Sequence, residues 1–323
     1  MPLILSGKDL EPLLSNPASM DSLRETIEEV LRAQQHGDIT SQGGFSLPMA
    51  DGKRNFRVVT ASLPGAGEVM RINPQFRGAT DTHFNILFDA ENGDLLGIIA
   101  GDELNIWRTG APAGIAARAL ARPGAKLLGL LASGRQARGQ LLAVYRAVPS
   151  LERVRVFSPT TEHRTAFAKK MTDWLGITVE AVDSPRAAVE GAEILSLATN
   201  SRTIVLESDW VSPGALINTI SSGQLPAEIV GRSRVIVTWK EEVLQGKPPR
   251  EPYASMIAAK QWSGNQIACE LGEVILGKVA GRQSENEIII FESVGMPAWD
   301  AASAAWAYRW ALDHKAGTSF SLA

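Results

Sequence analysis

The sequence predicts an α/β protein with a doubly wound parallel sheet and a second, β-rich domain. After Pro123, short apolar runs alternate with helical patterns, as is typical of a parallel sheet covered by helices on both faces. Residues 43–106 instead show strand patterns separated by turn residues, with Asn92-Gly93 as a strong hairpin signal. At 323 residues the chain also exceeds a typical domain of roughly 100 to 200 residues.

The same patterns place the individual elements. In the second half of the chain the expected strands are residues 126–132, 154–158, 177–182, 193–198, 215–220, 234–239 and 287–292. The helices between them are expected at residues 134–147, 161–175, 185–191 and 225–231. Elsewhere, helices are expected within residues 9–36, at about 107–122, at 264–278 and at 299–314, with Gly37 ending the first group.

Composition excludes several classes of protein. A net charge of −3 gives no basic field for nucleic acid or anionic lipid. The single cysteine, Cys269, excludes an internal disulfide and a thiolate metal cluster, and the four histidines lack metal-ligand spacing. The N-terminus has no signal-peptide pattern, and no apolar run approaches the ~20 residues needed to span a bilayer. We therefore expect a cytoplasmic protein without a metal, a nucleic-acid partner or a membrane.

A nucleotide-binding corner follows the first strand of the predicted parallel sheet. The apolar run 126–132 leads into small residues and then a helix, and such a turn lets backbone amides approach a pyrophosphate at the helix N-terminus. The expected contacts are Ala132, Ser133, Gly134, Arg135, Gln136 and Ala137. Because Ala132 stands where a glycine is usual, a turn that binds nothing is the alternative.

The next strand supports the nucleotide interpretation and indicates which cofactor is bound. It ends about 20 residues downstream, where a ribose-binding residue is expected. An acidic residue there would bind the 2′-hydroxyl group of NAD, but this chain has Ser158, Thr160 and Arg164. Hydroxyl groups and an arginine suit a 2′-phosphate better, so NADP(H) is preferred and NAD(H) is the alternative. Arg164 could also be a solvated helix residue.

Several motifs, in order, resemble the ornithine cyclodeaminase/mu-crystallin family over most of the chain, from about residue 68 onward. The matching segments are Trp107-Arg108-Thr109-Gly110-Ala111, residues 132–137, residues 270–282, Phe291-Glu292-Ser293-Val294-Gly295 and Asp300. The resemblance implies a homodimer with two domains in each chain. A Rossmann domain would span residues 116–296, and a substrate-binding and dimerisation domain would combine residues 1–115 and 297–323.

The resemblance also implies chemistry. Members of the family move a hydride between nicotinamide and the α-carbon of an amino or imino acid. Arg108 matches the arginine that binds the substrate carboxylate, a task that suits its bidentate geometry. A surface ion pair at a helix start is the alternative role for Arg108. Ser293, Val294 and Gly295 resemble the family's loop beside the nicotinamide, and Thr109, also an expected cofactor contact, follows Arg108 in the matching segment. Thr199 and Asn200 end the fourth predicted strand of the parallel sheet, where cofactor contacts are expected.

Three positions depart from the family pattern. Gly223 stands about where cyclodeaminases carry an aspartate, Met70 falls at the family's lysine, and a second carboxylate-binding arginine is absent near Gly44. Arg71 and Arg77 are weak substitutes, and strand alternation places Arg71 on the outer side of its strand. His83 is either a proton donor or, as we prefer, a turn histidine.

The sequence thus predicts an NAD(P)-dependent oxidoreductase that acts on a small imino or amino acid bearing a carboxylate. Ornithine cyclodeaminase, converting ornithine to proline and ammonia, is one alternative, and the missing aspartate argues against it. A crystallin-like protein that binds cofactor without turnover is the other, because the usual lysine and second arginine are missing.

Overall fold

The computed structural model describes residues 1–48, 54–76, 83–247 and 249–322, and the predicted site residue Arg77 lies outside these ranges. The chain forms two compact units. Unit 1 comprises Met1–Arg108 with Met296–Ala323, and unit 2 comprises Thr109–Gly295. The expected limits, after residue 115 and before residue 297, lie near these positions.

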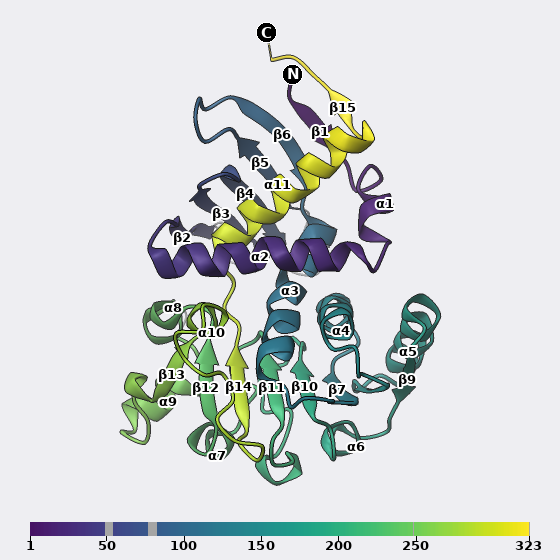
Figure 1. Cartoon of the computed structure of the whole chain (residues 1–323), viewed down its shortest axis with the longest axis vertical. Coiled ribbons are helices and arrows are strands. Elements are labelled where there is room, and N and C mark those ends of the chain that lie inside the picture. Colours follow the sequence, from purple (N-terminus) through teal and green to yellow (C-terminus); the bar gives the residue numbers. More distant parts are fainter. Residues whose placement is uncertain (49–53, 77–82, 248, 323) are drawn as a thin grey trace. The chain divides into compact units, whose positions relative to one another are not determined.

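Unit 2 contains the predicted doubly wound parallel sheet (Figure 1). Its described strands are β7 (Leu127–Leu131), β8 (Arg153–Phe157), β9 (Thr178–Ala181), β10 (Ile194–Leu197), β11 (Leu216–Thr219), β12 (Arg234–Val237), β13 (Ile267–Glu270) and β14 (Ile289–Glu292). They run in the order β13-β12-β14-β11-β10-β7-β8-β9, so the winding direction reverses between β7 and β10. Ligands of such sheets bind outside the carboxyl ends of the strands at this reversal.

Helices cover both faces of this sheet (Figure 1). They are α4 (Arg135–Ala147), α5 (Thr161–Leu175), α6 (Pro185–Val189), α7 (Ala227–Gly231), α8 (Lys240–Gln245), α9 (Tyr253–Ala258), α10 (Leu271–Ile275) and most of α3 (Asp102–Leu120). The small residues after Arg108 allow α3 to pack closely on α4. A Cβ on Gly110 would lie 2.3 Å from the Gly139 carbonyl oxygen, and one on Gly114 would lie 2.6 Å from that of Ala143.

Two predicted helices of this region need correction. The helix expected at 264–278 is a 3₁₀ turn (Gly264–Gln266), the edge strand β13 and the short α10. Buried Ile267 and Cys269 alternate with exposed Ala268, a period of two that suits a strand against β12. Helix α3 begins at Asp102 rather than near Trp107, because Asp102 and Glu103 place negative charge at its positive end.

Unit 1 is a mixed sheet with helices on one face. Its described strands are β1 (Leu3–Leu5), β2 (Thr40–Pro48), β3 (Arg54–Leu63), β4 (Gly67–Phe76), β5 (Phe84–Phe88), β6 (Leu95–Ala100) and β15 (Thr318–Ser319). The order β15-β1-β6-β5-β4-β3-β2 includes two unpredicted strands, β1 and β15, which pair the two ends of the chain. The Asn92-Gly93 hairpin between β5 and β6 is confirmed, with Gly93 at φ +75°.

The helices of unit 1 are α1 (Glu11–Leu14), α2 (Ser19–His36) and α11 (Pro297–His314). Helix α11 crosses the sheet and contacts β3, β4 and α2 (Figure 1). Its sequence is rich in alanine, so it lies close to the strands, and every second strand residue is buried beneath it: Val59, Ala61, Val69, Leu87 and Ile99. This face carries the polar cluster described below.

The part of the chain that the structure describes has neither a membrane-spanning helix nor a metal site. The helices there are too short or too polar to cross a bilayer. No group of histidine, cysteine and acidic side chains among the described residues is arranged to hold a metal ion.

Candidate active site

The turn between β7 and α4 has the form expected of a pyrophosphate-binding loop. Gly134 is the N-cap of α4 in extended conformation, so the first amides of the helix face out of its positive end. The hydroxyl groups of Ser133 and Ser158 lie 2.7 Å apart and tie this loop to the end of β8. Gln136, in the first helical turn, has a buried Oε1 without a hydrogen-bond partner among the described residues. Small residues and unused polar groups therefore meet where a dinucleotide would bind.

A pocket of about 520 Å³ lies at the same edge of the sheet. Its wall includes Ala132, Ser158 and Thr199 from the predicted cofactor set, together with apolar Phe157 and Trp210. Small-molecule sites are usually roughly 300 to 1,000 Å³, mostly apolar and supplied with a few polar groups. The pocket therefore suits the adenosine half of a dinucleotide.

Thr199, Asn200 and Thr109 of the predicted set lie in segments braced by hydrogen bonds. The Thr199 carbonyl accepts hydrogen bonds from Ser221 Oγ (3.0 Å) and Gln224 Nε2 (2.7 Å), so the loop that contains Thr199 and Asn200 is braced by the next loop. The carbonyl of Thr109 accepts from Gln140 Nε2 on α4 at 3.0 Å. These contacts fix the positions of the predicted residues. That the residues bind a cofactor stays a prediction.

Arg164 is held more tightly than the sequence suggests. It is 7% exposed, its Nη1 donates to the Ser158 carbonyl at 3.1 Å, and its Nη2 donates to Asp183 at 2.8 Å. The solvated alternative is therefore wrong. The cation lies beside the end of β8, where the ribose is expected, but Asp183 offsets part of its charge.

Hydrogen bonds to the ends of two neighbouring strands, β11 and β12, fix the loop after β14. The Ser293 amide donates to the Thr219 carbonyl at 2.9 Å, and the Val294 amide donates to Thr238 Oγ1 at 2.9 Å. Just before it, buried Glu292 accepts hydrogen bonds from Arg250 and Tyr253. Burial raises the pKa of the Glu292 carboxyl group, while Arg250 and Tyr253 oppose the shift. The segment Ser293-Val294-Gly295 is thus rigidly supported.

In unit 1, the buried carboxylate of Asp300 on α11 binds two arginines. Arg108 Nε donates to Oδ1 at 2.9 Å, and Arg71 Nη1 lies 3.0 Å from both oxygens. Burial lowers the pKa of the Arg108 guanidinium, and Asp300 opposes that shift. The alternative of a surface pair for Arg108 is therefore wrong. Asp300 was noted in the sequence only as a family position, and its signal is that it is a carboxylate within the apolar first half of its helix.

The expectation that Arg71 lies on the outer side of its strand is also wrong. Arg71 shares a face of β4 with buried Val69 and pairs across the strands with Val59, so it faces α11. Met70 faces the other way and is 36% exposed. The alternation rule holds, but the sequence assigned Met70 rather than Arg71 to the inner face.

A third arginine occupies the space left by Gly44. A Cβ on Gly44 would lie 2.6 Å from Arg57 Nε, and the charge of Arg57 contributes to lowering the pKa of Arg108. The sequence did not single out Arg57. Arg57 lies two residues before buried Val59 on β3, and this spacing could have shown that both side chains point to the inner face of the unit 1 sheet.

His83 is a member of this cluster and not a simple turn histidine. It is 5% exposed, and its Nδ1 lies 3.3 Å from Asp102 Oδ1 at the start of α3. Burial lowers the pKa of His83; Arg71 and Arg108 add to this effect, while Asp102 and Asp300 oppose it. The charges of four side chains therefore act on the ring.

The loop at the cyclodeaminase aspartate position contains no carboxylate. Gly223 has φ +79°, and its amide donates to the Glu251 carbonyl at 2.9 Å. The carboxylate of Glu251 accepts from the Ser255 amide at 3.2 Å, within α9. Residues 220–224 thus provide backbone contacts and hydroxyl groups at this position.

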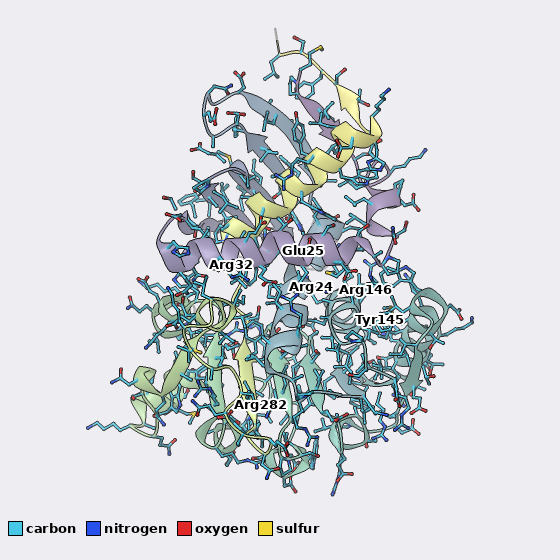
Figure 2. All side chains as sticks on the ribbon, viewed as in Figure 1. Arg24, Glu25, Arg32, Tyr145, Arg146 and Arg282 are labelled. Atoms are coloured by element: carbon cyan, nitrogen blue, oxygen red, sulfur yellow. The ribbon has the colours of Figure 1, made fainter. Side chains whose placement is uncertain are left out.

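Some of the motifs that carry the family resemblance have structural roles. Glu270 and Glu273 form a capping box at α10. Arg282, labelled in Figure 2, donates to the carbonyl oxygens of Leu120, Ser284 and Glu287. These residues stabilise unit 2 and are not part of the predicted cofactor set.

Comparison with known proteins gives the family. A family model described as ornithine cyclodeaminase/mu-crystallin family matches residues 13–315. The chain belongs to this family. The resemblance predicted from its motifs is therefore confirmed, as is the fold of a Rossmann-type parallel sheet joined to a second, β-rich sheet.

Three relatives illustrate the family. The Δ1-pyrroline-2-carboxylate reductase of Bacillus cereus is 31% identical, over 84% of this chain and 86% of its own. A Thermococcus litoralis enzyme of the same name, solved with NADH and L-proline, has a TM-score of 0.90 at 28% identity and covers 98% of this chain and 100% of its own. An archaeal alanine dehydrogenase, solved as a dimer with bound NAD, has a TM-score of 0.89 at 26% identity, with coverage of 100% and 99%.

Proposed function

We propose that this protein reduces a small imino acid to an amino acid at the expense of NAD(P)H, with Δ1-pyrroline-2-carboxylate as the first candidate substrate. The broader activity, an NAD(P)-dependent oxidoreductase of imino and amino acids, follows from its family and relatives. The observation that carries the substrate proposal is the pair of arginines, Arg108 and Arg71, held by one buried Asp300.

Each of these three side chains would have a role in the reaction. Bound NAD(P)H supplies a hydride to the imine carbon, and the imine nitrogen takes up a proton. Arg108 and Arg71 would bind the carboxylate next to that carbon, since charge-assisted hydrogen bonds from arginine fix both its position and its orientation. Asp300 keeps both guanidinium groups in place before the substrate arrives, which reduces the ordering cost of binding.

For the cofactor, the sheet edge and its pocket support the pyrophosphate and adenosine contacts predicted from the sequence. We propose NADP(H) as the preferred form, because Ser158 rather than a carboxylate follows β8 and Arg164 donates to its carbonyl oxygen. Asp183 binds the same guanidinium, so we expect a modest preference with NAD(H) still accepted. Relatives of this chain have been solved with NADH and NAD.

A homodimer is part of the proposal. The face of the unit 1 sheet opposite α11 carries exposed Phe45, Leu47 and Met70, an apolar surface of the kind that marks an interface. The archaeal alanine dehydrogenase relative is a dimer. Light scattering after gel filtration should give twice the chain mass, and Phe45→Asp combined with Leu47→Asp should reduce it to that of a monomer.

The test of the function is a substrate panel with the purified protein. NADPH and NADH oxidation is followed with Δ1-pyrroline-2-carboxylate, its six-membered homologue, pyruvate plus ammonia, and pyruvate plus methylamine. We expect the cyclic imines to be reduced fastest. Ornithine incubated with NAD(P) should release no ammonia, because residues 220–224 lack the carboxylate of the cyclodeaminases. Rapid formation of proline and ammonia from ornithine would contradict the proposal.

A further inference from the structure

Beneath α11, polar side chains gather on the inner face of the unit 1 sheet. Arg71 on β4 pairs in register with Asn85 on β5, and His83 lies two residues before Asn85 on the same side. Arg108 from α3 and Asp300 from α11 complete this group, which we call the inner cluster. The carboxylate-binding arginines of the proposed function are thus grouped with a histidine and an amide.

The inner cluster has more polar atoms than it can pair internally. Among the described residues, His83 Nε2, Asn85 Oδ1 and Arg71 Nε are buried without hydrogen-bond partners. A buried polar group without a hydrogen bond is destabilising, so groups of this kind are rare unless they serve a ligand or water. Their proximity to the carboxylate-binding arginines points to a small polar ligand.

Asp102 lies at the opposite edge of the His83 ring. Nδ1 is 3.3 Å from Asp102 Oδ1 without forming a hydrogen bond, and the His83 backbone amide donates to the same oxygen at 3.4 Å. A Cβ on Gly101 would lie 2.6 Å from His83 Cδ2, so glycine at this position makes room for the ring. A carboxylate at Nδ1 with an unpaired Nε2 is the arrangement in which an imidazole exchanges a proton through Nε2.

We propose that His83 donates the proton to the imine nitrogen of the substrate, with Asp102 orienting its ring; this inference rests on the proposed function. As the hydride forms the new C–H bond, the π electrons of the C=N bond move to nitrogen and take the Nε2 proton. The cofactor is oxidised, the imine is reduced to the amine, and His83 becomes neutral. Solvent returns a proton to His83 before the next turnover.

Because of the surrounding charges, the protonation of His83 should depend on whether the substrate is bound. Burial, Arg71 and Arg108 lower the pKa of His83, while Asp102 and Asp300 oppose them. A bound carboxylate adds a negative charge beside the two arginines and therefore raises the pKa of His83. Binding of an anionic substrate should then be coupled to uptake of a proton.

Proton uptake can be measured without turnover. Pyrrole-2-carboxylate, a planar analogue that cannot be reduced, is titrated calorimetrically into the protein saturated with NADPH, in buffers of different ionisation enthalpy near neutral pH. We expect the wild-type protein to take up a substantial fraction of one proton, about 0.3 or more. His83→Gln should bind the analogue with this uptake lost, and His163→Gln, at an exposed histidine on α5, should behave as wild type. Uptake unchanged in His83→Gln, or absent in the wild-type protein, would overturn the proposal.

Kinetics with the best imine of the substrate panel provide a second readout. We expect His83→Gln and His83→Asn to lower kcat by about 10²–10⁴-fold, with a much smaller change in KM and no change in thermal stability large enough to explain the loss. Asp102→Asn should shift the alkaline limb of the kcat profile to lower pH, because it removes a charge that raises the pKa of His83. A wild-type kcat profile retained in His83→Gln would contradict the role. If the wild-type protein reduces no imine, the proposed function fails, while the calorimetric result still reports on His83.

Discussion

The sheet edge of unit 2 and the inner cluster of unit 1 differ in how they hold their functional groups. At the sheet edge, backbone amides, glycine and small hydroxyl residues lie where strands end, as in any doubly wound sheet. In the inner cluster, side chains from β4, β5, α3 and α11 meet around Asp300. The first arrangement tolerates many sequences, whereas the second depends on a few charged residues. This difference explains why the cofactor is easier to infer than the substrate.

Breaking the inner cluster at Arg108 should have the largest effect. We expect Arg108→Ala to lower kcat/KM by about 10³-fold or more, because the substrate carboxylate would lose a charge-assisted hydrogen bond from a buried guanidinium, and truncating one partner of such a pair typically costs about 2–5 kcal/mol of binding. Arg118→Ala, at an exposed position of the same helix, is the matched control and should stay within a few-fold of wild type. Steady-state kinetics with the preferred imine measure both. Activity retained in Arg108→Ala would remove its assigned role.

Asp300→Asn should mainly affect stability. It leaves Arg71 and Arg108 buried with their shared anion neutralised, at a cost of about 3–5 kcal/mol. Chemical denaturation, with and without saturating NADPH, should show this decrease in the free energy of unfolding. A change of less than about 1 kcal/mol would mean that the arginines find other partners and that Asp300 does not organise the cluster.

Substitutions at the sheet edge should affect activity less and should change the preference between NADPH and NADH. Ser158→Asp should raise the KM for NADPH about tenfold relative to that for NADH, since its carboxylate repels a 2′-phosphate and accepts from a 2′-hydroxyl group. Asp183→Asn should act in the opposite direction by a few-fold, because it leaves Arg164 with more uncompensated charge. Equal KM changes for both cofactors in both variants would show that Ser158 and Arg164 do not contact this part of the nucleotide.

The smallest predicted effect is a dependence of stability on pH. The folded state lowers the pKa of His83 from 6.5, chiefly by burial, so folding favours its neutral form. The corresponding stabilisation is fully present above pH 6.5 and is lost as the pH falls through the lower, folded-state pKa. Between about pH 7.5 and pH 5, the Tm of the wild-type protein should therefore fall more than that of His83→Gln. Parallel falls in Tm would argue against a buried neutral His83.

Much of unit 2 is predictable from sequence because the relevant signals are local. A buried parallel strand such as β7 is a continuous apolar run, and the loop after it is defined by neighbouring small residues. The segment 264–278 was misassigned because a four-residue edge strand and a five-residue helix are each too short to establish their own period.

The inner cluster was harder to predict because its contacts join residues far apart in the chain. Arg71 and Arg108 meet at Asp300, which is separated from them by 229 and 192 positions. No local pattern links these residues. The sequence also predicted Met70 rather than Arg71 on the inner face of β4, an error of one residue in register. His83 could be named as a candidate, but its burial and its four charged neighbours emerge only from the packing of α3, β4 and α11.

The destination of the hydride tests the account most directly. The protein is incubated with Δ1-pyrroline-2-carboxylate and NADPH carrying deuterium at the transferable position of nicotinamide C4, and the product is analysed by mass spectrometry. The account predicts proline with one deuterium on the α-carbon, and a large loss of this product in Arg108→Ala. Cofactor oxidation without label on the α-carbon, or no reduction of any imine by the cofactor-bound protein, would contradict it.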